Sequence, residues 1–295
     1  MPTVRNRGAS LFYSAEVGNG DEGPPVVFVN EAGLGGWLWG WQHASLAGPF
    51  ETVVWDLRGT GRSEGTAGPY DLETLASDFE AVCREIDGRS VHAVGLGLGG
   101  AIALEAARSS GRVETLTLLG TAAHGSAFDL EALFEPPVDN GEATVEGDSG
   151  ESSVDDDSAA SDCAGDDRRD AIRSTLESAL SADFRDRQPD VVDGIVDWRL
   201  EGDADLAGRR AQLAALAEFD ARDWLVEVTQ PTLVVHGTAD ALVLPDAGRD
   251  LADGLPRGTF VPLEGAGHLA NVERSRAVND RFFGFLEDHT DDLER

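Results

Sequence analysis

The 295-residue sequence contains no lysine, one methionine and two cysteines. Two cysteines are too few for a disulfide framework or a four-cysteine metal site. No apolar run approaches membrane-spanning length, and the first ten residues lack the apolar segment of a secretory signal, so we expect a cytoplasmic protein. Five of the six histidines have no metal-ligand spacing, and we expect neither a metal nor another cofactor.

Acidic residues dominate the charge of the chain. Asp and Glu number 55, and the formal net charge is −32. Such a surface should repel nucleic acid and anionic membranes, so we expect neither as a partner. The composition resembles that of cytosolic proteins from salt-accumulating archaea, in which mobile ions screen the repulsion between carboxylates. An acidic surface that binds a partner is the alternative interpretation.

Short apolar runs recur along the chain and predict buried strands. Continuous apolar runs suit strands that are covered on both faces of a parallel sheet. Amphipathic helical patterns lie between most of them. The alternation predicts an α/β fold with a doubly wound, mostly parallel sheet and right-handed crossovers. The runs are residues 26–29, 52–55, 91–94, 113–119, 232–235 and 259–261, after an opening hairpin at 4–16, and the helical patterns are 72–86, 101–107, 246–255 and 273–286.

The alternation is interrupted in the middle of the chain. Residues 1–123 and 229–295 form the predicted core, and residues 124–228 form a predicted helical cap inserted into it. Residues 135–170 are rich in Asp, Glu, Ser and Gly with almost no large apolar residue, which predicts a disordered loop. The amphipathic patterns of the cap cover residues 170–182, 190–200 and 205–219.

A glycine-rich turn follows the apolar run at 91–94. Gly95, Gly97 and Gly99 stand at alternate positions where a strand ends and a helix of small residues begins. This arrangement resembles the G-x-S-x-G nucleophile turn of α/β-hydrolases, with glycine at the central position. A glycine-rich turn between strand and helix is also typical of phosphate-binding loops, so this turn alone leaves both interpretations open.

Three further segments favour the α/β-hydrolase interpretation. Residues 234–240 (VVHGTAD) and 265–269 (GAGHL) resemble the loops that carry the triad acid and the triad histidine, and residues 56–63 (DLRGTGRS) resemble the D-x-R-G-x-G-x-S turn. The order of nucleophile position, acid and histidine is also that of the fold. The chain thus resembles the α/β-hydrolase fold superfamily, and most closely its lactonase- and haloperoxidase-like members.

The resemblance implies roles for four positions. Asp240 would hold the His268 ring and stabilise its protonated form. The backbone N–H groups of Leu98 and Ala32 would be the oxyanion donors, which need no particular side chain. The alternatives are a satisfied surface histidine at His268 and ordinary turn chemistry at Asp240.

Two departures from the family pattern affect the chemistry. Gly97 has no side chain and cannot form an acyl-enzyme, and neither Cys83 nor Cys163 is placed to replace it. Glycine would, however, relax the backbone strain of about 1–3 kcal/mol that other residues carry at such a turn. The usual His-Gly pair of the oxyanion loop is replaced by Asn30 and Glu31. If Glu31 points inward, at roughly 5 Å and an effective dielectric near 20, it would disfavour an oxyanion by about 3 kcal/mol.

Three tryptophans begin the helical segment after the first buried strand. Trp37 and Trp41 share a helix face if the helix begins early. Core packing is one interpretation of Trp37, Trp39 and Trp41, and an aromatic wall for a ligand, with Trp37 in the binding site, is the other.

Two hypotheses of function follow from these residues. In the first, His268 is a general base in hydrolysis of an ester or lactone, with Glu31 as a possible acid or base and water in the space left by the missing serine side chain. In the second, the protein is non-catalytic and binds a small apolar ligand, or a protein partner through its cap. A nucleophile from another turn, Ser63 or Thr121, is a weaker third hypothesis.

Overall fold

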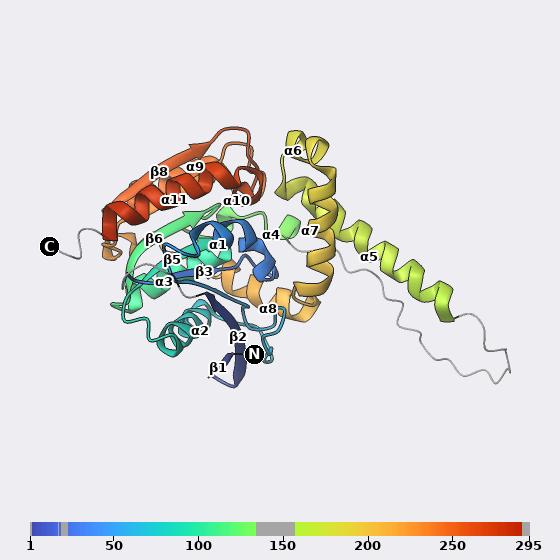
Figure 1. Ribbon diagram of the computed structural model, residues 1–295, viewed down its shortest axis with the longest axis horizontal. Coiled ribbons are helices and arrows are strands. Elements are labelled where there is room, and N and C mark those ends of the chain that lie inside the picture. Colours follow the sequence, from blue (N-terminus) through green and yellow to red (C-terminus); the bar gives the residue numbers. More distant parts are fainter. Residues whose placement is uncertain (1, 17, 19–22, 134–156, 291–295) are drawn as a thin grey trace.

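The computed structural model describes residues 2–16, 18, 23–133 and 157–290. Eight strands form one sheet in the order β1-β2-β4-β3-β5-β6-β7-β8 (Figure 1). Strands β1 and β2 pair antiparallel to their neighbours, and all other pairs are parallel, as the alternation predicted. The strands are β1 (Thr3–Asn6), β2 (Ala9–Glu16), β3 (Val26–Val29), β4 (Thr52–Trp55), β5 (Val91–Leu96), β6 (Val113–Leu119), β7 (Thr232–Gly237) and β8 (Gly258–Leu263).

Two hydrophobic cores cover the two faces of the sheet. In β3, Val27 and Val29 belong to one core, whereas Val26 and Phe28 belong to the other. This division explains why the central strands are continuous apolar runs, because successive side chains point to opposite faces. The helices over the first core are α2 (Leu72–Glu85), α3 (Leu98–Ser109) and α9 (Pro245–Gly254), and those over the second are α1 (Gly40–Leu46) and α11 (Ser275–Thr290), with the short α10 (Ala270–Glu273) beside them.

The inserted segment contains helices at one end of the sheet (Figure 1). They are α4 (Leu130–Leu133), α5 (Asp157–Ala179), α6 (Ala182–Arg187), α7 (Pro189–Gly202) and α8 (Leu206–Ala217). Residues 135–156 of the predicted loop lie outside the described residues. From Asp157 onward the structure has a helix where the sequence favoured a loop up to residue 170.

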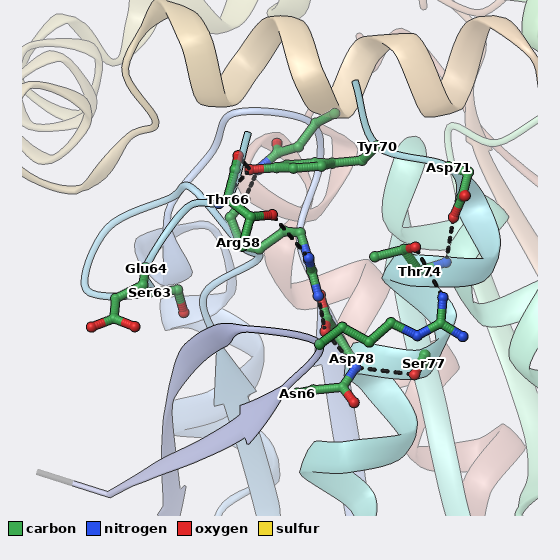
Figure 2. A network of polar contacts seen from close by, with 12 residues as sticks. Asn6, Arg58, Ser63, Glu64, Thr66, Tyr70, Asp71, Thr74, Ser77 and Asp78 are labelled. Atoms are coloured by element: carbon green, nitrogen blue, oxygen red, sulfur yellow. Dashed lines mark hydrogen bonds and ion pairs between the residues drawn. The ribbon is translucent and has the colours of Figure 1, made fainter. Parts of the chain in front are cut away.

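The turn after β4 is fixed by a buried ion pair. The Arg58 guanidinium donates to the Asp78 carboxylate through Nε at 2.5 Å and Nη2 at 2.6 Å, and both side chains are almost fully buried. Asn6 also donates to Asp78 from β1, at 2.8 Å. Figure 2 shows this network, which joins the turn of the D-x-R-G motif to helix α2 and to the first hairpin.

No helix among the described residues is long and apolar enough to cross a membrane.

Candidate active site

The glycine turn between β5 and α3 has a sharp backbone conformation with a positive φ. Gly97 separates β5 from α3. Its φ is 53° and its ψ is −112°, a backbone conformation that residues other than glycine rarely adopt. A Cβ atom at Gly95 would overlap the backbone of Gly99, and one at Gly99 would overlap the backbone of Val29. The flanking glycines therefore allow the helix to approach the strand, and Gly97 adopts the turn without strain.

Glu31 lies in the centre of this site. It follows β3 and is 1% exposed. Its Oε1 accepts hydrogen bonds from Ala32 N at 2.5 Å and Leu98 N at 3.0 Å. These are the two N–H groups expected to hold an oxyanion, and Leu98 begins α3, where the helix dipole also favours an anion. In this structure the two N–H groups expected to be oxyanion donors therefore converge on the protein's own carboxylate.

The space beside Gly97 is filled by the same carboxylate. A Cβ atom at Gly97 would overlap Oε2 of Glu31. The expectation that a water molecule occupies the space left by the serine is therefore wrong for this arrangement, since Glu31 has taken that space. Glu31 faces inward, as the oxyanion argument required, but it binds the donors directly instead of opposing a bound oxyanion from a distance.

His268 connects two carboxylates. Its Nδ1 lies 2.9 Å from Asp240 Oδ2, and its Nε2 lies 3.0 Å from Glu31 Oε2. His268 is 2% exposed and Asp240 3%, so the alternative of a surface histidine does not hold. The turn interpretation of Asp240 is compatible with its contact to His268, because Oδ1 accepts from Leu242 N and Val243 N while Oδ2 faces the ring.

Electrostatics favour an imidazolium ion at this position. Burial opposes a charge on His268, but the carboxylates of Asp240 and Glu31 outweigh it and raise the pKa of the ring to about 10. Burial likewise opposes the charge of Asp240, yet His268 and His236 hold the pKa of that carboxyl well below its usual value. Both ring nitrogens of an imidazolium are donors, and each has a carboxylate acceptor here.

A cavity of about 30 Å³ adjoins Glu31 and His268. This volume holds about one water molecule. Ala32 and Trp37 also line it, so the residues predicted for the oxyanion and binding sites meet at one place. Most of the remaining lining is apolar and comes from the cap and nearby loops, including Leu34, Leu133, Leu176, Leu242 and Leu269.

Sequence reasoning missed two arginines at this cavity. Arg199 of α7 and Arg209 of α8 line it, and both are buried. Charged residues on a cap helix ordinarily face solvent. The one signal was that Arg199 follows the buried Ile195 and Val196 at helical spacings of four and three, which places it on the buried face of α7.

A small residue also makes room for the histidine. Gly120 follows β6 with a φ of 47°, and a Cβ atom there would lie 2.9 Å from the His268 ring. The loop that carries His268 is held by Glu273, whose Oε1 accepts from Gly267 N at 2.9 Å. Neither position belongs to the motifs that located the site.

The three tryptophans have different environments. Trp39 is fully buried and packs on Phe28 with ring centroids 5.1 Å apart, as the core interpretation required. Trp37 and Trp41 both contact Trp198 of α7, at centroid distances of 6.2 and 5.7 Å. Trp37 and Trp41 thus share a face, and only Trp37 lines the cavity.

The other hydroxyl candidates have backbone partners. Ser63 Oγ donates to Asp56 O at 2.6 Å, and Thr121 Oγ1 donates to Leu119 O at 2.8 Å. Neither hydroxyl contacts His268 in any hydrogen bond of the structure, which removes support from the third hypothesis. Within the described residues, no group of three or more His, Cys, Asp or Glu side chains is arranged to hold a metal ion.

Comparison with known proteins agrees with this architecture. The alpha/beta hydrolase fold family matches residues 24–275, and the chain belongs to this family. A 3-oxoadipate enol-lactonase from Acinetobacter baylyi is 24% identical, covering 94% of this chain and 93% of its own length. The enol-lactonase structure from Burkholderia xenovorans is 25% identical with a TM-score of 0.79, covering 97% of this chain and all of that chain. An esterase from Thermogutta terrifontis, 23% identical with a TM-score of 0.76 and 98% of each chain covered, shares the fold.

Proposed function

We propose that this α/β hydrolase acts on a small molecule with a carboxylate nucleophile, Glu31, in place of a serine hydroxyl. The observation that carries the proposal is the position of the Glu31 carboxylate. One oxygen is held by Ala32 N and Leu98 N, and the other faces His268 beside Gly97. Carboxylates form covalent intermediates in enzymes, and this one is oriented at both oxygens.

Because Ala32 N and Leu98 N already donate to Glu31, they favour a substrate whose first reaction step requires no oxyanion donor. Displacement at a saturated carbon satisfies this requirement, because no carbonyl oxygen becomes charged. Oε2 of Glu31 would form a bond to the carbon while the bond to the leaving group breaks, and the leaving group would depart with the electron pair. The product of this step is a neutral alkyl ester of Glu31.

Hydrolysis of that ester would use the remaining groups. Once Glu31 is an ester, His268 loses one of its two carboxylate partners and releases its Nε2 proton to solvent water more readily. Its Nε2 can then take a proton from water as the water oxygen attacks the Glu31 carboxyl carbon. Charge develops on Oε1, where Ala32 N and Leu98 N already donate. The bond from carbon to Oε2 breaks, and the alcohol leaves with a proton from His268. The Glu31 carboxylic acid then gives its remaining proton to Nε2 of His268, which restores the carboxylate and the imidazolium.

The cost of burying these charges also supports a chemical role. Each buried ion loses several kcal/mol of solvation, and well-packed apolar residues often serve stability as well or better. Glu31, His268 and Asp240 are all at most 3% exposed. An apolar side chain could fill the space beside Gly97 without this solvation cost, so packing alone does not explain why Glu31, His268 and Asp240 are buried together.

Hydrolysis of an ester or lactone with His268 as general base receives less support. The enol-lactonases and esterase to which the chain is similar suggest such substrates. Here, however, Nε2 of His268 donates to Glu31, and the oxyanion donors are occupied. A substrate carbonyl would have to displace Glu31 from both positions.

Isotope labelling of the purified chain tests the proposal. Short alkyl bromides, short-chain esters and lactones are each offered in a single turnover in H₂¹⁸O. We expect an alkyl bromide to give an alcohol with oxygen from the protein, and the Glu31 peptide to gain one ¹⁸O. Glu31→Gln should lose this activity, and His268→Gln should accumulate the alkyl ester.

Two further results of the panel decide between mechanisms. Ester turnover by the native chain with ¹⁸O in the acid product and none in Glu31 would support the general-base mechanism and overturn ours. The variant Glu31→Gly with Gly97→Ser is the matched control, since it frees the oxyanion donors and provides a hydroxyl. Ester hydrolysis by this variant alone would show that the rest of the site is competent for acyl transfer.

A non-catalytic binding protein is the second candidate, and it is favoured by the Glu31 carboxylate, which occupies the two N–H groups that a substrate oxyanion would need. The cavity of about 30 Å³ admits neither a substrate nor a ligand larger than water unless the cap moves, so both candidates require that movement. If the protein is a non-catalytic binding protein, no compound of the panel will be turned over or will label Glu31, and a short apolar ligand will raise the unfolding temperature.

A further inference from the structure

Asp203 connects the cap to the loop that carries Glu31. It ends helix α7, and its side chain is 4% exposed. Its Oδ1 accepts from Gly35 N at 3.2 Å and from Trp37 Nε1 at 3.0 Å. Both donors lie a few residues after Glu31, so one cap carboxylate holds this loop through its backbone and through a side chain.

The other oxygen of Asp203 faces the two buried arginines. Oδ2 accepts from Arg199 Nε at 2.7 Å and lies 3.4 Å from Arg209 Nη2. Arg209 also donates to Gly33 O at 3.5 Å, in the same loop. Since both arginines line the cavity beside Glu31, Asp203 partly neutralises the positive charge at that wall.

The neighbouring backbone adds contacts at the same place. Ala204 N donates to Gly33 O at 2.9 Å, and Gln212 of α8 accepts from Gly33 N at 2.6 Å. A Cβ atom at Gly35 would overlap Gly202 O, so the loop and the end of α7 are in close contact. The conformation of the loop therefore depends on this end of the cap.

We infer that Asp203 is a positioning residue, which holds the loop so that the Glu31 carboxylate stays between the Ala32 and Leu98 N–H groups and the His268 ring. Its effect on turnover rests on the proposed function. Its effect on the position of Glu31 does not, because the contact between Glu31 and His268 can be observed without a substrate.

The test is Asp203→Asn, read by NMR titration of the His268 ring in the full chain. Loss of the Glu31 contact should lower the pKa of His268 by about one unit or more, since a carboxylate within 4–6 Å shifts a pKa by about that much. Asp205→Asn is a control for the loss of an exposed charge two residues away, where Asp205 caps α8 through Gly208 N, and Trp37→Phe is the control that leaves every charge in place. We expect the His268 titration of Asp205→Asn to match that of the native chain.

A second variant covers the case in which Asp203→Asn does not fold. Trp37→Phe removes one donor to Asp203 and leaves every charge in place, and we expect a smaller decrease of the His268 pKa. A native titration in a folded Asp203→Asn protein, or in Trp37→Phe if only that variant folds, would overturn the inference. A shifted His268 titration in the variants, together with no turnover of any panel compound by the native chain, would retain the inference and reject the proposed function.

Discussion

At the scale of single residues, Gly97 and Glu31 depend on each other. The carboxylate occupies the volume that a side chain at position 97 would need. A positive φ at Gly97 adds a backbone cost for any other residue. Glycine at position 97 and glutamate at position 31, which the sequence presented as two separate departures from the family pattern, therefore belong to one steric arrangement.

The pKa of His268 makes a prediction about stability and pH. The folded value is about 10 and the ordinary value is 6.5, so the folded state binds the proton more tightly. The resulting stabilisation is fully present below about pH 6.5 and is lost as the pH rises through about 10. We expect the free energy of unfolding to fall across this window by up to about 1.4 kcal/mol per pH unit.

Urea unfolding at a series of pH values measures this slope. The charged groups that face the His268 ring are Asp240 and Glu31. His236 Nε2 lies 3.2 Å from Asp240 Oδ2 on its other side, and Arg199 and Arg209 line the same cavity as His268. The control is His268→Gln, which cannot bind the proton and should show a flatter dependence between pH 6.5 and 10. Equal slopes in the two proteins would contradict the assignment of the imidazolium to His268.

At the scale of elements, the Arg58–Asp78 pair fixes α2 to the turn after β4. We expect Asp78→Asn to lower the free energy of unfolding by about 3–5 kcal/mol, because it leaves a buried guanidinium without its counter-charge. Glu73→Gln is the control, since it removes the exposed Arg7–Glu73 pair on the same helix and should cost less than about 1 kcal/mol. Urea midpoints followed by tryptophan fluorescence compare the two, and similar losses would show that burial of the pair carries no special cost.

Most of the core elements could be predicted because each is determined locally. The central strands are apolar on both faces, and helices α2, α9 and α11 have regular amphipathic spacing. The short helix α6 and the first half of α5 were not predicted. Both contain many charged residues, and neither has the apolar periodicity on which the prediction depended.

The site was predictable only where motifs fix the backbone. Gly97, Asp240 and His268 follow strands whose ends meet at one edge of the sheet, so their proximity follows from the fold. The path of the Glu31 side chain into the space beside Gly97 depends on its rotamer and on the loop around Gly33 and Gly35. That loop is held by the cap, and no pattern in the sequence indicates how closely the cap approaches it.

At the scale of the whole molecule, the net charge of −32 predicts a strong dependence of stability on salt. Repulsion among like charges destabilises the compact state more than the expanded one. The screening length falls from about 10 Å at 0.1 M salt to about 3 Å at 1 M, which is shorter than most distances between surface carboxylates. We expect the thermal midpoint to rise by about 5–10 °C over this range, which corresponds to a gain of a few kcal/mol.

Thermal unfolding in KCl and in sucrose distinguishes screening of the repulsion between carboxylates from the exclusion of a cosolute from the protein surface. Sucrose strengthens burial without screening charge, so its effect should increase steadily with concentration. The effect of KCl should instead be steepest below about 0.5 M, where the screening length changes most. A midpoint that did not change between 0.1 and 1 M KCl would mean that the acidic residues lie far enough apart, or bind enough counter-ions, for their mutual repulsion to be negligible. Ion pairs such as Arg58–Asp78 should contribute little to the salt dependence, because buried pairs are screened much less than exposed charges.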